Sequence, residues 1–315
     1  MAMESFFIGT KEDGYTIYLN EQPIRPVGMN EDITTHHKVI IGNCMGMPEI
    51  EDCSVHLIVT SPPYFNAPFD YKSLFKGYNE FLKLIEDFAN ESFRVLQDGR
   101  IAVINIDDML VDGEKFPIVA DTIKIFQKSG FRYRDRIVWK KPDGYTRISR
   151  RSGVILQNPY PMYFYLDNLQ ESIIIFQKGK FDYRSVSSEI RERSKIDTKE
   201  FLTKKWFTTV WEMMNVMPGS PLEKDIAAFP EELPYRCIKL FSYVGEIILD
   251  PFAGSGTTMK VARQLKRNSI GIEIKKELMP IIKKKLGFDG QTKLTEDKDG
   301  FEVVIRKRTQ LKPQL

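Results

Sequence analysis

The stretch EIILDPFAGSGTTMKVARQLKRNSIGIEI, residues 246–274, sets the fold class of this chain. It opens with a short apolar run that ends at Asp250, which is the pattern of a buried strand. A turn rich in small residues follows, and apolar residues at helical spacing begin near Gly256. A second apolar run ends close to Glu273. The order strand, turn, helix and strand predicts one unit of a parallel α/β sheet.

Other short apolar runs alternate with amphipathic stretches along the chain, and this pattern extends the sheet. We expect strands at residues 38–42, 55–60, 100–106, 136–140, 172–177, 246–250 and 269–274. We expect helices at residues 78–96 and 117–128, and a third after Gly256. The predicted fold class is therefore α/β, with a Rossmann-like sheet.

The composition is that of an ordinary globular protein, with 42% hydrophobic and 28% charged residues in a chain of 315. No window approaches the roughly 18 uninterrupted apolar residues of a membrane span. The first residues lack the basic, apolar and small-residue segments of a signal peptide. The three cysteines and three histidines have no metal-ligand spacing. We therefore expect a cytoplasmic protein with no membrane segment and no metal site.

Two segments are distinctly basic, although the formal net charge of the whole chain is only +3. Residues 140–151 and residues 178–205 each sum to +4, so the remaining chain is mildly acidic. Such a distribution favours a localised surface that faces a polyanion. Two solvated loops would carry the same charge, and charge alone leaves both interpretations open.

The turn at residues 250–256, called the glycine turn below, has the features of a nucleoside-binding turn. Small residues let a ligand approach the backbone, and the start of the following helix offers free N–H groups. Glu273, at the tip of the next strand, stands where an acidic residue accepts hydrogen bonds from ribose in nucleotide-binding α/β folds. A G-x-G-x-x-G match starting at Gly254 would need glycine at the place of Met259. S-adenosylmethionine therefore fits better than a pyrophosphate, and a purely structural turn is the alternative.

A second turn, in VTSPPYF at residues 59–65, ends another predicted strand on two prolines. Neither Pro62 nor Pro63 has an N–H to give to a sheet, so the strand must stop there. The carboxyl ends of neighbouring parallel strands share one crevice. We therefore expect this proline corner (residues 61–64) and the glycine turn to face each other. Their order along the chain does not affect the site, as in a circular permutation whose termini lie close together.

Together, TSPPY (60–64) and DPFAGSGTT (250–258) resemble the motifs of the amino-methylating DNA methyltransferases, in the permuted beta group whose catalytic motif precedes the cofactor motif. The resemblance covers roughly residues 39–283. It includes FRVLQDGRIAVINIDD (93–108), GFRYRDRIVWKKPDG (130–144), ESIIIFQKG (171–179), VWEM (210–213) and FPEELPYRCIKLFS (229–242). It implies a circularly permuted S-adenosylmethionine-dependent methyltransferase sheet with an inserted target-recognition region.

The resemblance also implies S-adenosyl-L-methionine as cofactor and double-stranded DNA as substrate. Matched by position, the catalytic motif is Ser61, Pro62, Pro63 and Tyr64. The residues matched to the cofactor site are Asn43, Phe229, Pro230, Asp250, Phe252, Gly254, Ser255, Gly256, Thr257 and Glu273. Asn43 stands where the family commonly has Asp. Asp225 stands where the family often has His, and it is assigned no role.

The catalytic motif suits methylation of an exocyclic amine. An enzyme that modifies a base must rotate it out of the duplex, and Tyr64 can stack on the extruded ring. The prolines restrict the backbone, so that Ser61 Oγ and the Pro62 carbonyl oxygen can both accept hydrogen bonds from one amino group. Positioning of the amine then accounts for in-line transfer without a covalent intermediate.

The two basic segments then correspond to DNA contacts. The residues expected to bind DNA are Lys141, Arg147, Arg150, Arg151, Arg191, Arg193, Lys204 and Lys205. The expected organisation is an N-terminal extension (1–35) with a small hairpin, a catalytic half (36–179), a target-recognition insert (180–210), a cofactor half (211–285) and a C-terminal tail (286–315).

The serine form of the motif, SPPY, favours cytosine N4, because the aspartate form dominates among adenine-N6 enzymes of this family. We expect a site-specific cytosine-N4 DNA methyltransferase, with adenine N6 as the alternative. Methylation of RNA or of a glutamine side chain, and a non-catalytic DNA-binding protein on this fold, are further alternatives. Carbon-5 methylation is disfavoured because none of the cysteines follows proline, and we interpret all three as core residues. A cognate restriction endonuclease and a monomeric or homodimeric state are compatible with the resemblance.

Overall fold

The computed structural model describes residues 33–66, 74–142, 157–162, 166, 168–214, 229–289 and 299–306, together with the backbone of residues 8–9 and 16–17. The chain divides into two compact units, Met1–Asn30 and Glu31–Leu315. In the first unit, β1 (Ile8–Gly9) pairs antiparallel with β2 (Thr16–Ile17). Most of the predicted N-terminal hairpin lies outside the described residues.

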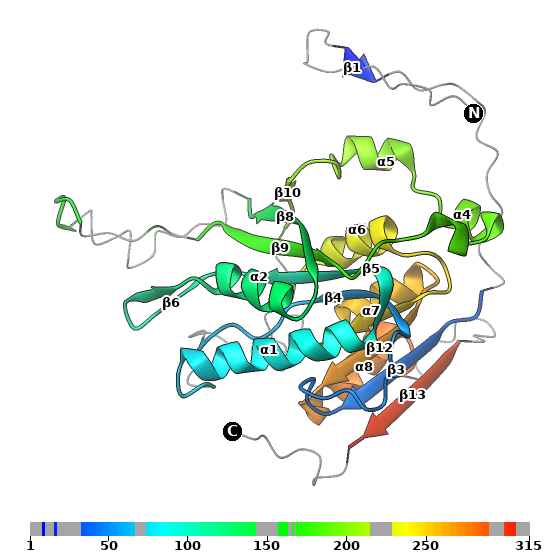
Figure 1. Cartoon of the computed structure of the whole chain (residues 1–315), viewed down its shortest axis with the longest axis horizontal. Coiled ribbons are helices and arrows are strands. Elements are labelled where there is room, and N and C mark those ends of the chain that lie inside the picture. Colours follow the sequence, from blue (N-terminus) through cyan, green and yellow to red (C-terminus); the bar gives the residue numbers. More distant parts are fainter. Residues whose placement is uncertain are drawn as a thin grey trace. The chain divides into compact units, whose positions relative to one another are not determined.

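Within the described residues, the second unit is built on one sheet of nine strands (Figure 1). Their order across the sheet is β10 (Val210–Glu212), β8 (Arg132–Lys140), β9 (Gln170–Gln177), β5 (Leu96–Ile106), β4 (Val55–Thr60), β11 (Ile247–Asp250), β12 (Asn268–Glu273), β3 (His36–Ile41) and β13 (Gly300–Ile305). From β5 to β13 the strands all run parallel, whereas β9 runs antiparallel to β5 and β8. The parallel strands therefore end along one side of the sheet, the carboxyl edge, and begin along the opposite amino edge.

Helices cover both faces of this sheet. Outside the nine-stranded sheet, the elements in the described part of the second unit are α1 (Tyr78–Val95), β6 (Met109–Val111), β7 (Glu114–Phe116), α2 (Ile118–Lys128), η2 (Tyr183–Ser185), α4 (Ser188–Arg193), α5 (Thr198–Thr203), α6 (Glu232–Phe241), α7 (Thr257–Gln264), η4 (Lys276–Leu278) and α8 (Met279–Leu286). α1 and α2 pack on the face that carries Ile58 and Ala102, and α6 and α7 pack on the face that carries Leu57 and Val103. Because both faces are buried, the central strands are apolar at nearly every position, as the sequence shows.

The predicted α/β class and all of the predicted strands and helices are confirmed, with boundaries that differ by a few residues. The sheet also contains β13, which lies in the predicted C-terminal tail and pairs with β3. The prediction of three core cysteines holds for Cys44 and Cys237, but Cys53 is exposed. It occupies the turn before β4 with a φ of 51°, so its side chain lies outside the apolar layers. None of the helices in the described part of the chain combines the length and the apolar character that a membrane span needs.

Candidate functional site

The two motifs meet at the carboxyl edge of the sheet. β4 and β11 are neighbouring parallel strands, with Leu57 opposite Ile248. At their ends, Thr60 Oγ1 donates a hydrogen bond of 2.6 Å to Asp250 Oδ1. This bond joins the residue before the proline corner to the first residue of the glycine turn. The prediction that the two motifs face each other is therefore confirmed.

Left-handed glycines and a buried carboxylate shape the glycine turn. Gly254 and Gly256 have φ angles of 52° and 83°, in the region that favours glycine. The Gly254 N–H donates to Glu273 Oε2 at 2.8 Å, and the Lys275 N–H donates to Glu273 Oε1 at 2.7 Å. These two bonds use about half of the acceptor positions of a carboxylate. Glu273 therefore keeps acceptor capacity for the hydroxyl groups of a ribose, and the turn fits a nucleoside.

Burial governs the electrostatics of both carboxylates at this edge. Asp250 is 2% exposed, and burial raises its pKa to about 6, although hydrogen bonds from Thr60 and the Phe252 N–H oppose the shift. Burial also raises the pKa of Glu273, against the two backbone N–H groups that it accepts. Both side chains are thus held by the turns around them, which suits a rigid binding site.

Other residues matched to the cofactor site surround the same turn. The Phe252 ring lies edge-on to Phe88, with ring centroids 5.1 Å apart. Ser255 is buried, and its hydroxyl accepts a hydrogen bond from Lys285 Nζ on α8. Thr257 is the first residue of α7. The turn is therefore packed on one side by α1 and on the other by α8.

Phe229 and Pro230 directly precede α6 and are buried. Phe229 belongs to the same apolar cluster as Val59, which lies two positions before Ser61 on β4. This cluster lies on the face of the sheet that α6 covers. The structure therefore brings the segment before α6 close to the strand that carries the proline corner.

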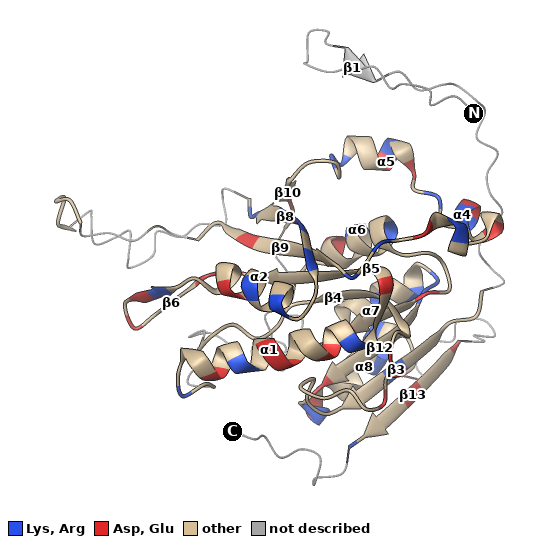
Figure 2. Ribbon diagram, in the orientation of Figure 1, with Lys and Arg blue, Asp and Glu red and all other residues tan. Residues whose placement is uncertain are grey.

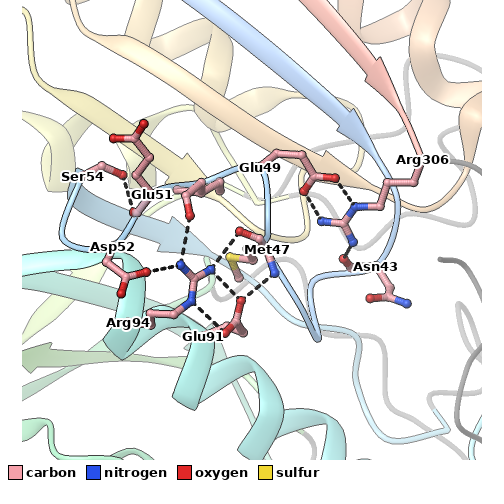
Figure 3. Close-up of polar contacts among 10 residues, drawn as sticks. Asn43, Met47, Glu49, Glu51, Asp52, Ser54, Glu91, Arg94 and Arg306 are labelled. Atoms are coloured by element: carbon pink, nitrogen blue, oxygen red, sulfur yellow. Dashed lines mark hydrogen bonds and ion pairs between the residues drawn. The ribbon is translucent and has the colours of Figure 1, made fainter.

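Asn43 follows β3 beside the tip of β12. The neighbouring Gly42 N–H donates to the Glu273 carbonyl oxygen at 2.9 Å. Arg306, directly after β13, donates from Nη1 to the Asn43 carbonyl oxygen at 2.6 Å and forms two further bonds with the Glu49 carboxylate (Figure 3). Arg306, directly after the C-terminal strand, therefore fixes the backbone of Asn43. This backbone lies next to Glu273, the residue expected to bind ribose.

Ser61 is the first residue of the proline corner. Its hydroxyl donates to the Asn105 carbonyl oxygen at 2.9 Å. Because the hydroxyl proton is used in that bond, the lone pairs of Ser61 Oγ remain available as acceptors. Pro62 is buried and Pro63 is half-buried, so the corner is packed as well as stiff.

Tyr64 ends the proline corner and is only 6% exposed. Its hydroxyl donates to Glu171 Oε2 at 2.7 Å. Burial and the Glu171 carboxylate raise the pKa of Tyr64 well above its ordinary value, so the hydroxyl stays protonated. The ring is therefore anchored at its polar end to β9.

Sequence reasoning missed the polar residues that join this corner to the sheet. Asn105, on β5, is 1% exposed and donates from Nδ2 to Glu171 Oε2 at 2.7 Å. Lys141 Nζ pairs with Glu171 Oε1 at 2.7 Å and lies 5.5 Å from the Trp139 ring centroid. The available signal was a polar side chain within an apolar run, in RIAVINI for Asn105 and in ESIIIF for Glu171.

A further carboxylate, Asp107, lies directly after β5. It accepts hydrogen bonds from Asn168 Nδ2 and, at 3.4 Å, from Ser172 Oγ. Burial raises its pKa, against the bond from Asn168. Asp107 adds a second link between the end of β5 and the start of β9.

The first basic segment begins at Lys140, the last residue of β8, at the carboxyl edge. Its predicted DNA contacts Arg147, Arg150 and Arg151 lie outside the described residues. On the flanking strands, Lys140 of β8 lies opposite Gln170 of β9, and Ser172 lies opposite Ile106 at the end of β5. The end of β8 and the start of β9 therefore lie at the same edge of the sheet as Ser61.

The predicted target-recognition insert, residues 180–210, contains most of the second basic segment and begins at the amino edge instead. The Val244 N–H, just before β11, donates to Ser194 Oγ at 2.9 Å at the end of α4. Arg191 and Arg193 lie on α4, where acidic and basic side chains alternate (Figure 2). Arg193 pairs with Glu189 at 3.6 Å. A strand of six residues such as β4 is about 20 Å long, so these arginines are far from Ser61.

Two lysines of this segment, Lys204 and Lys205, directly follow α5. Lys204 Nζ pairs with Glu200 at 3.1 Å and with Glu232, at the start of α6, at 3.4 Å. Lys205 is exposed in the following turn. The structure therefore does not bring these residues together with the proline corner, and the target-recognition role of residues 180–210 stays a prediction.

Residues 55–284, the greater part of the chain, match the family model described as DNA methylase, of the N6/N4 methyltransferase group. The chain belongs to this DNA methylase family. The methylase is 39% identical over 292 residues to the type II methyltransferase M.MjaI of Methanocaldococcus jannaschii, covering 82% of this chain and 94% of that protein. It is 29% identical over 279 residues to the type II methyltransferase M.MthZI of Methanothermobacter thermautotrophicus, covering 80% and 77% of the two chains.

Solved structures agree with this assignment. A Thermus thermophilus protein assigned as a DNA modification methylase, in complex with S-adenosyl-L-methionine, matches the methylase with a TM-score of 0.64 at 28% identity, over 85% of this chain and 99% of that chain. The PvuII DNA methyltransferase, which is cytosine-N4-specific, matches with a TM-score of 0.58 over 84% and 90% of the chains, and at 17% identity this is a similarity of fold. The methylase is thus an S-adenosyl-L-methionine-dependent DNA methyltransferase.

Proposed function

We propose that this methylase is a site-specific, type II enzyme that methylates the N4 amine of a flipped-out cytosine in duplex DNA. The observation that carries the proposal is the bond between Thr60 and Asp250, because it puts Ser61 beside the glycine turn. The relatives named as type II methyltransferases support site specificity. The serine in SPPY supports cytosine over adenine as the target.

The enzyme belongs in the circularly permuted beta group. The order of elements supports this placement, because β3, β4 and β5 precede β11 and β12 in the chain while β11 lies between β4 and β12 in the sheet. The catalytic half (36–179) thus comes before the cofactor half (211–285), and the two halves share one edge.

The residues around the glycine turn hold the cofactor. S-adenosyl-L-methionine, when bound, supplies a methyl group activated by a sulfonium. Glu273 accepts hydrogen bonds from the ribose, Asn43 lies at the adenine, and Phe229 and Pro230 border the methionine portion. The remaining lining residues are Asp250, Phe252, Gly254, Ser255, Gly256 and Thr257.

The proline corner orients the reacting amine. Ser61 Oγ and the Pro62 carbonyl oxygen accept its two hydrogens, which favours a pyramidal nitrogen with its lone pair free. No strong base is needed before transfer, since the amine becomes acidic only as it is methylated. Tyr64 stacks on the extruded base, a contact worth about 1–3 kcal/mol. Because Tyr64 is 6% exposed, stacking requires neighbouring side chains to move off the ring.

Replacement of Ser61 by Ala tests this role. The variant loses an acceptor for the amine but keeps the prolines, so we expect methyl transfer to fall by about 10²-fold or more while cofactor affinity is unchanged. Transfer of tritiated methyl to whole-genome-amplified DNA measures the first quantity, and calorimetry measures the second. Parental transfer by the variant would remove Ser61 from the mechanism. A non-catalytic DNA-binding protein would show neither transfer nor cofactor binding.

Nucleoside mass spectrometry of DNA from cells that express the protein identifies the base. We expect N4-methylcytosine. N6-methyladenine without N4-methylcytosine would assign the enzyme to the adenine-N6 alternative and leave the cofactor site unchanged.

The DNA contacts follow the two basic segments. Arg147, Arg150 and Arg151 bind phosphates or guanines, and Lys141, at the carboxyl edge, supports them. Arg191, Arg193, Lys204 and Lys205 act as DNA contacts only if the duplex also reaches the second segment. The enzyme works in the cytoplasm, as a monomer or homodimer, with a cognate restriction endonuclease as its partner in a restriction-modification system.

A further inference from the structure

Glu171 is the centre of a polar network that begins at the proline corner. One carboxylate oxygen accepts hydrogen bonds from the Tyr64 hydroxyl and from Asn105 Nδ2, both at 2.7 Å. The other oxygen pairs with Lys141 Nζ, also at 2.7 Å. The Glu171 side chain is only 15% exposed. A carboxylate in such a place is tolerated because three donors from three elements surround it.

The same network reaches Ser61 from the other side. Ser61 Oγ donates to the carbonyl oxygen of Asn105, and the side chain of Asn105 donates to Glu171. The first and last residues of the proline corner are therefore both linked to Glu171, Tyr64 directly and Ser61 through Asn105. Buried hydrogen-bond networks of this kind restrict the groups that belong to them, and in this one Asn105 Oδ1 is the acceptor without a hydrogen-bond partner among the described residues.

The position of Glu171 explains how it can serve the corner. β9 runs antiparallel to its neighbours β5 and β8, so its first residues lie at the carboxyl edge rather than at the amino edge. In the register of β9 on β5, Asn105 lies opposite Ile173, two residues after Glu171. The antiparallel strand thus delivers a carboxylate to the edge where the parallel strands end.

We propose that Glu171 is a positioning residue for methyl transfer, which holds the ring of Tyr64 and the side chain of Asn105 so that the proline corner is formed before the target base enters. The proposal rests on the proposed function, since it concerns the slot for the same base. A ring whose hydroxyl is anchored loses little rotational freedom when a base stacks on it, and the binding energy of the base is then available for alignment of its amine.

Lys141 compensates the negative charge of Glu171 in this network. Removal of one partner of a buried ion pair leaves the other charge uncompensated, whereas Glu171→Gln removes the charge but keeps an oxygen that can accept from Tyr64. The neighbouring pair of Lys140 and Glu212, at 3.1 Å, has a Glu212 side chain that is 72% exposed. Glu212→Gln therefore supplies a matched control, because it removes a carboxylate that pairs with the adjacent lysine outside the network.

The experiment compares Glu171→Gln, Tyr64→Phe and the double variant in single-turnover transfer of tritiated methyl to whole-genome-amplified DNA. We expect each single variant to lower the transfer rate constant by about tenfold, which corresponds to about 1.4 kcal/mol, with unchanged cofactor affinity. The double variant should lose no more than either single variant, because both changes break the same link. Glu212→Gln should have the parental rate, and the melting temperatures should confirm that all variants are folded.

Two results would overturn the proposal: a parental rate for Tyr64→Phe, or losses that multiply in the double variant. Tyr64→Phe keeps the ring and the apolar packing, so it tests the link even if Glu171→Gln folds poorly. Failure of the proposed function is distinguishable, because the parental protein itself would then transfer no methyl group to DNA.

Discussion

At the scale of single residues, Asp250 shows how a buried charge is held at the centre of the site. Its carboxylate is 2% exposed and accepts hydrogen bonds from the Thr60 hydroxyl and the Phe252 N–H. These donors replace only part of the lost hydration, because burial still raises the pKa from 3.8 to about 6. At neutral pH the charged form therefore costs the fold about 3 kcal/mol.

Replacement of Asp250 by Asn should stabilise the protein at neutral pH. The amide keeps an oxygen that accepts both bonds and carries no charge, so we expect a gain of about 1–3 kcal/mol at pH 7.5. The folded parent retains its proton up to about pH 6, whereas the unfolded chain releases it near pH 3.8. The stability that this proton gives the parent is complete below about pH 4 and is lost as the pH rises through 6.

Urea unfolding at a series of pH values checks this sign. The advantage of Asp250→Asn over the parent should grow between about pH 4 and pH 6.5 and stay constant above that range. A difference that is the same at pH 4 and pH 7 would contradict a raised pKa for Asp250.

The sequence indicated some of these residues and not others for a physical reason. Asp250 and Glu273 each end an apolar run, and the carboxyl ends of parallel strands share an edge, so their proximity could be predicted. Glu171 and Asn105 meet only because β9 pairs with β5 in one register. That register depends on pairing between strands distant in the chain, which neither composition nor periodicity encodes.

At the scale of elements, two arginines fasten the segment between β3 and β4. Arg306, after β13, binds the Asn43 carbonyl oxygen and the Glu49 carboxylate. Arg94, on α1, donates to the Met47 carbonyl oxygen at 2.8 Å and forms ion pairs with Asp52 and Glu91 (Figure 3). The start of this segment is therefore tied to the C-terminal strand, and its middle is tied to a helix.

Replacement of Arg306 by Met should weaken cofactor binding. Methionine fills part of the buried volume but forms no hydrogen bond with Asn43 or Glu49. Cofactor binding must then order the segment, and a cost of about 1 kcal/mol in binding free energy would weaken the affinity about fivefold. Calorimetric titration with S-adenosyl-L-methionine measures the change. Glu302→Gln is the control, because the pair of Lys38 and Glu302 joins the same strands at 3.7 Å with Glu302 62% exposed. Equal affinity in the Arg306 variant and the control would contradict the proposed link.

Elements were predictable where both of their faces are buried. β4 and β11 read as continuous apolar runs because helices cover the sheet on both sides. β13 is only partly buried, and its partner β3 lies at the opposite end of the sequence. The short apolar run of β13 was therefore a weak signal for a strand. α6 contains Pro234, which argues against a helix, yet it lies in the first turn, where its missing N–H has no intrahelical acceptor.

At the scale of the whole sheet, the two edges have different chemistry. The carboxyl edge gathers Ser61, Tyr64, Asp250 and Glu273, together with Lys140, where the first basic segment begins, and Gln170 at the start of β9. The amino edge carries α4, in which basic residues are mixed with acidic ones (Figure 2). Under the proposed function, a duplex that delivers a base to Ser61 lies closer to Lys140 and Lys141, where the first basic segment begins, than to α4.

The salt dependence of DNA binding separates the two segments. Each phosphate contact adds close to one unit to the slope of log K against log salt. Replacement of Arg150 and Arg151 together by Ala should therefore flatten the slope by about 2. The matched double replacement of Arg191 and Arg193 removes the same charge from α4 and should leave the slope unchanged, because these residues lie at the amino edge.

Fluorescence anisotropy with unmethylated duplex at several salt concentrations measures both slopes. A flattened slope for the α4 variant and an unchanged slope for the other would place the duplex along residues 180–210 and support their predicted role in target recognition.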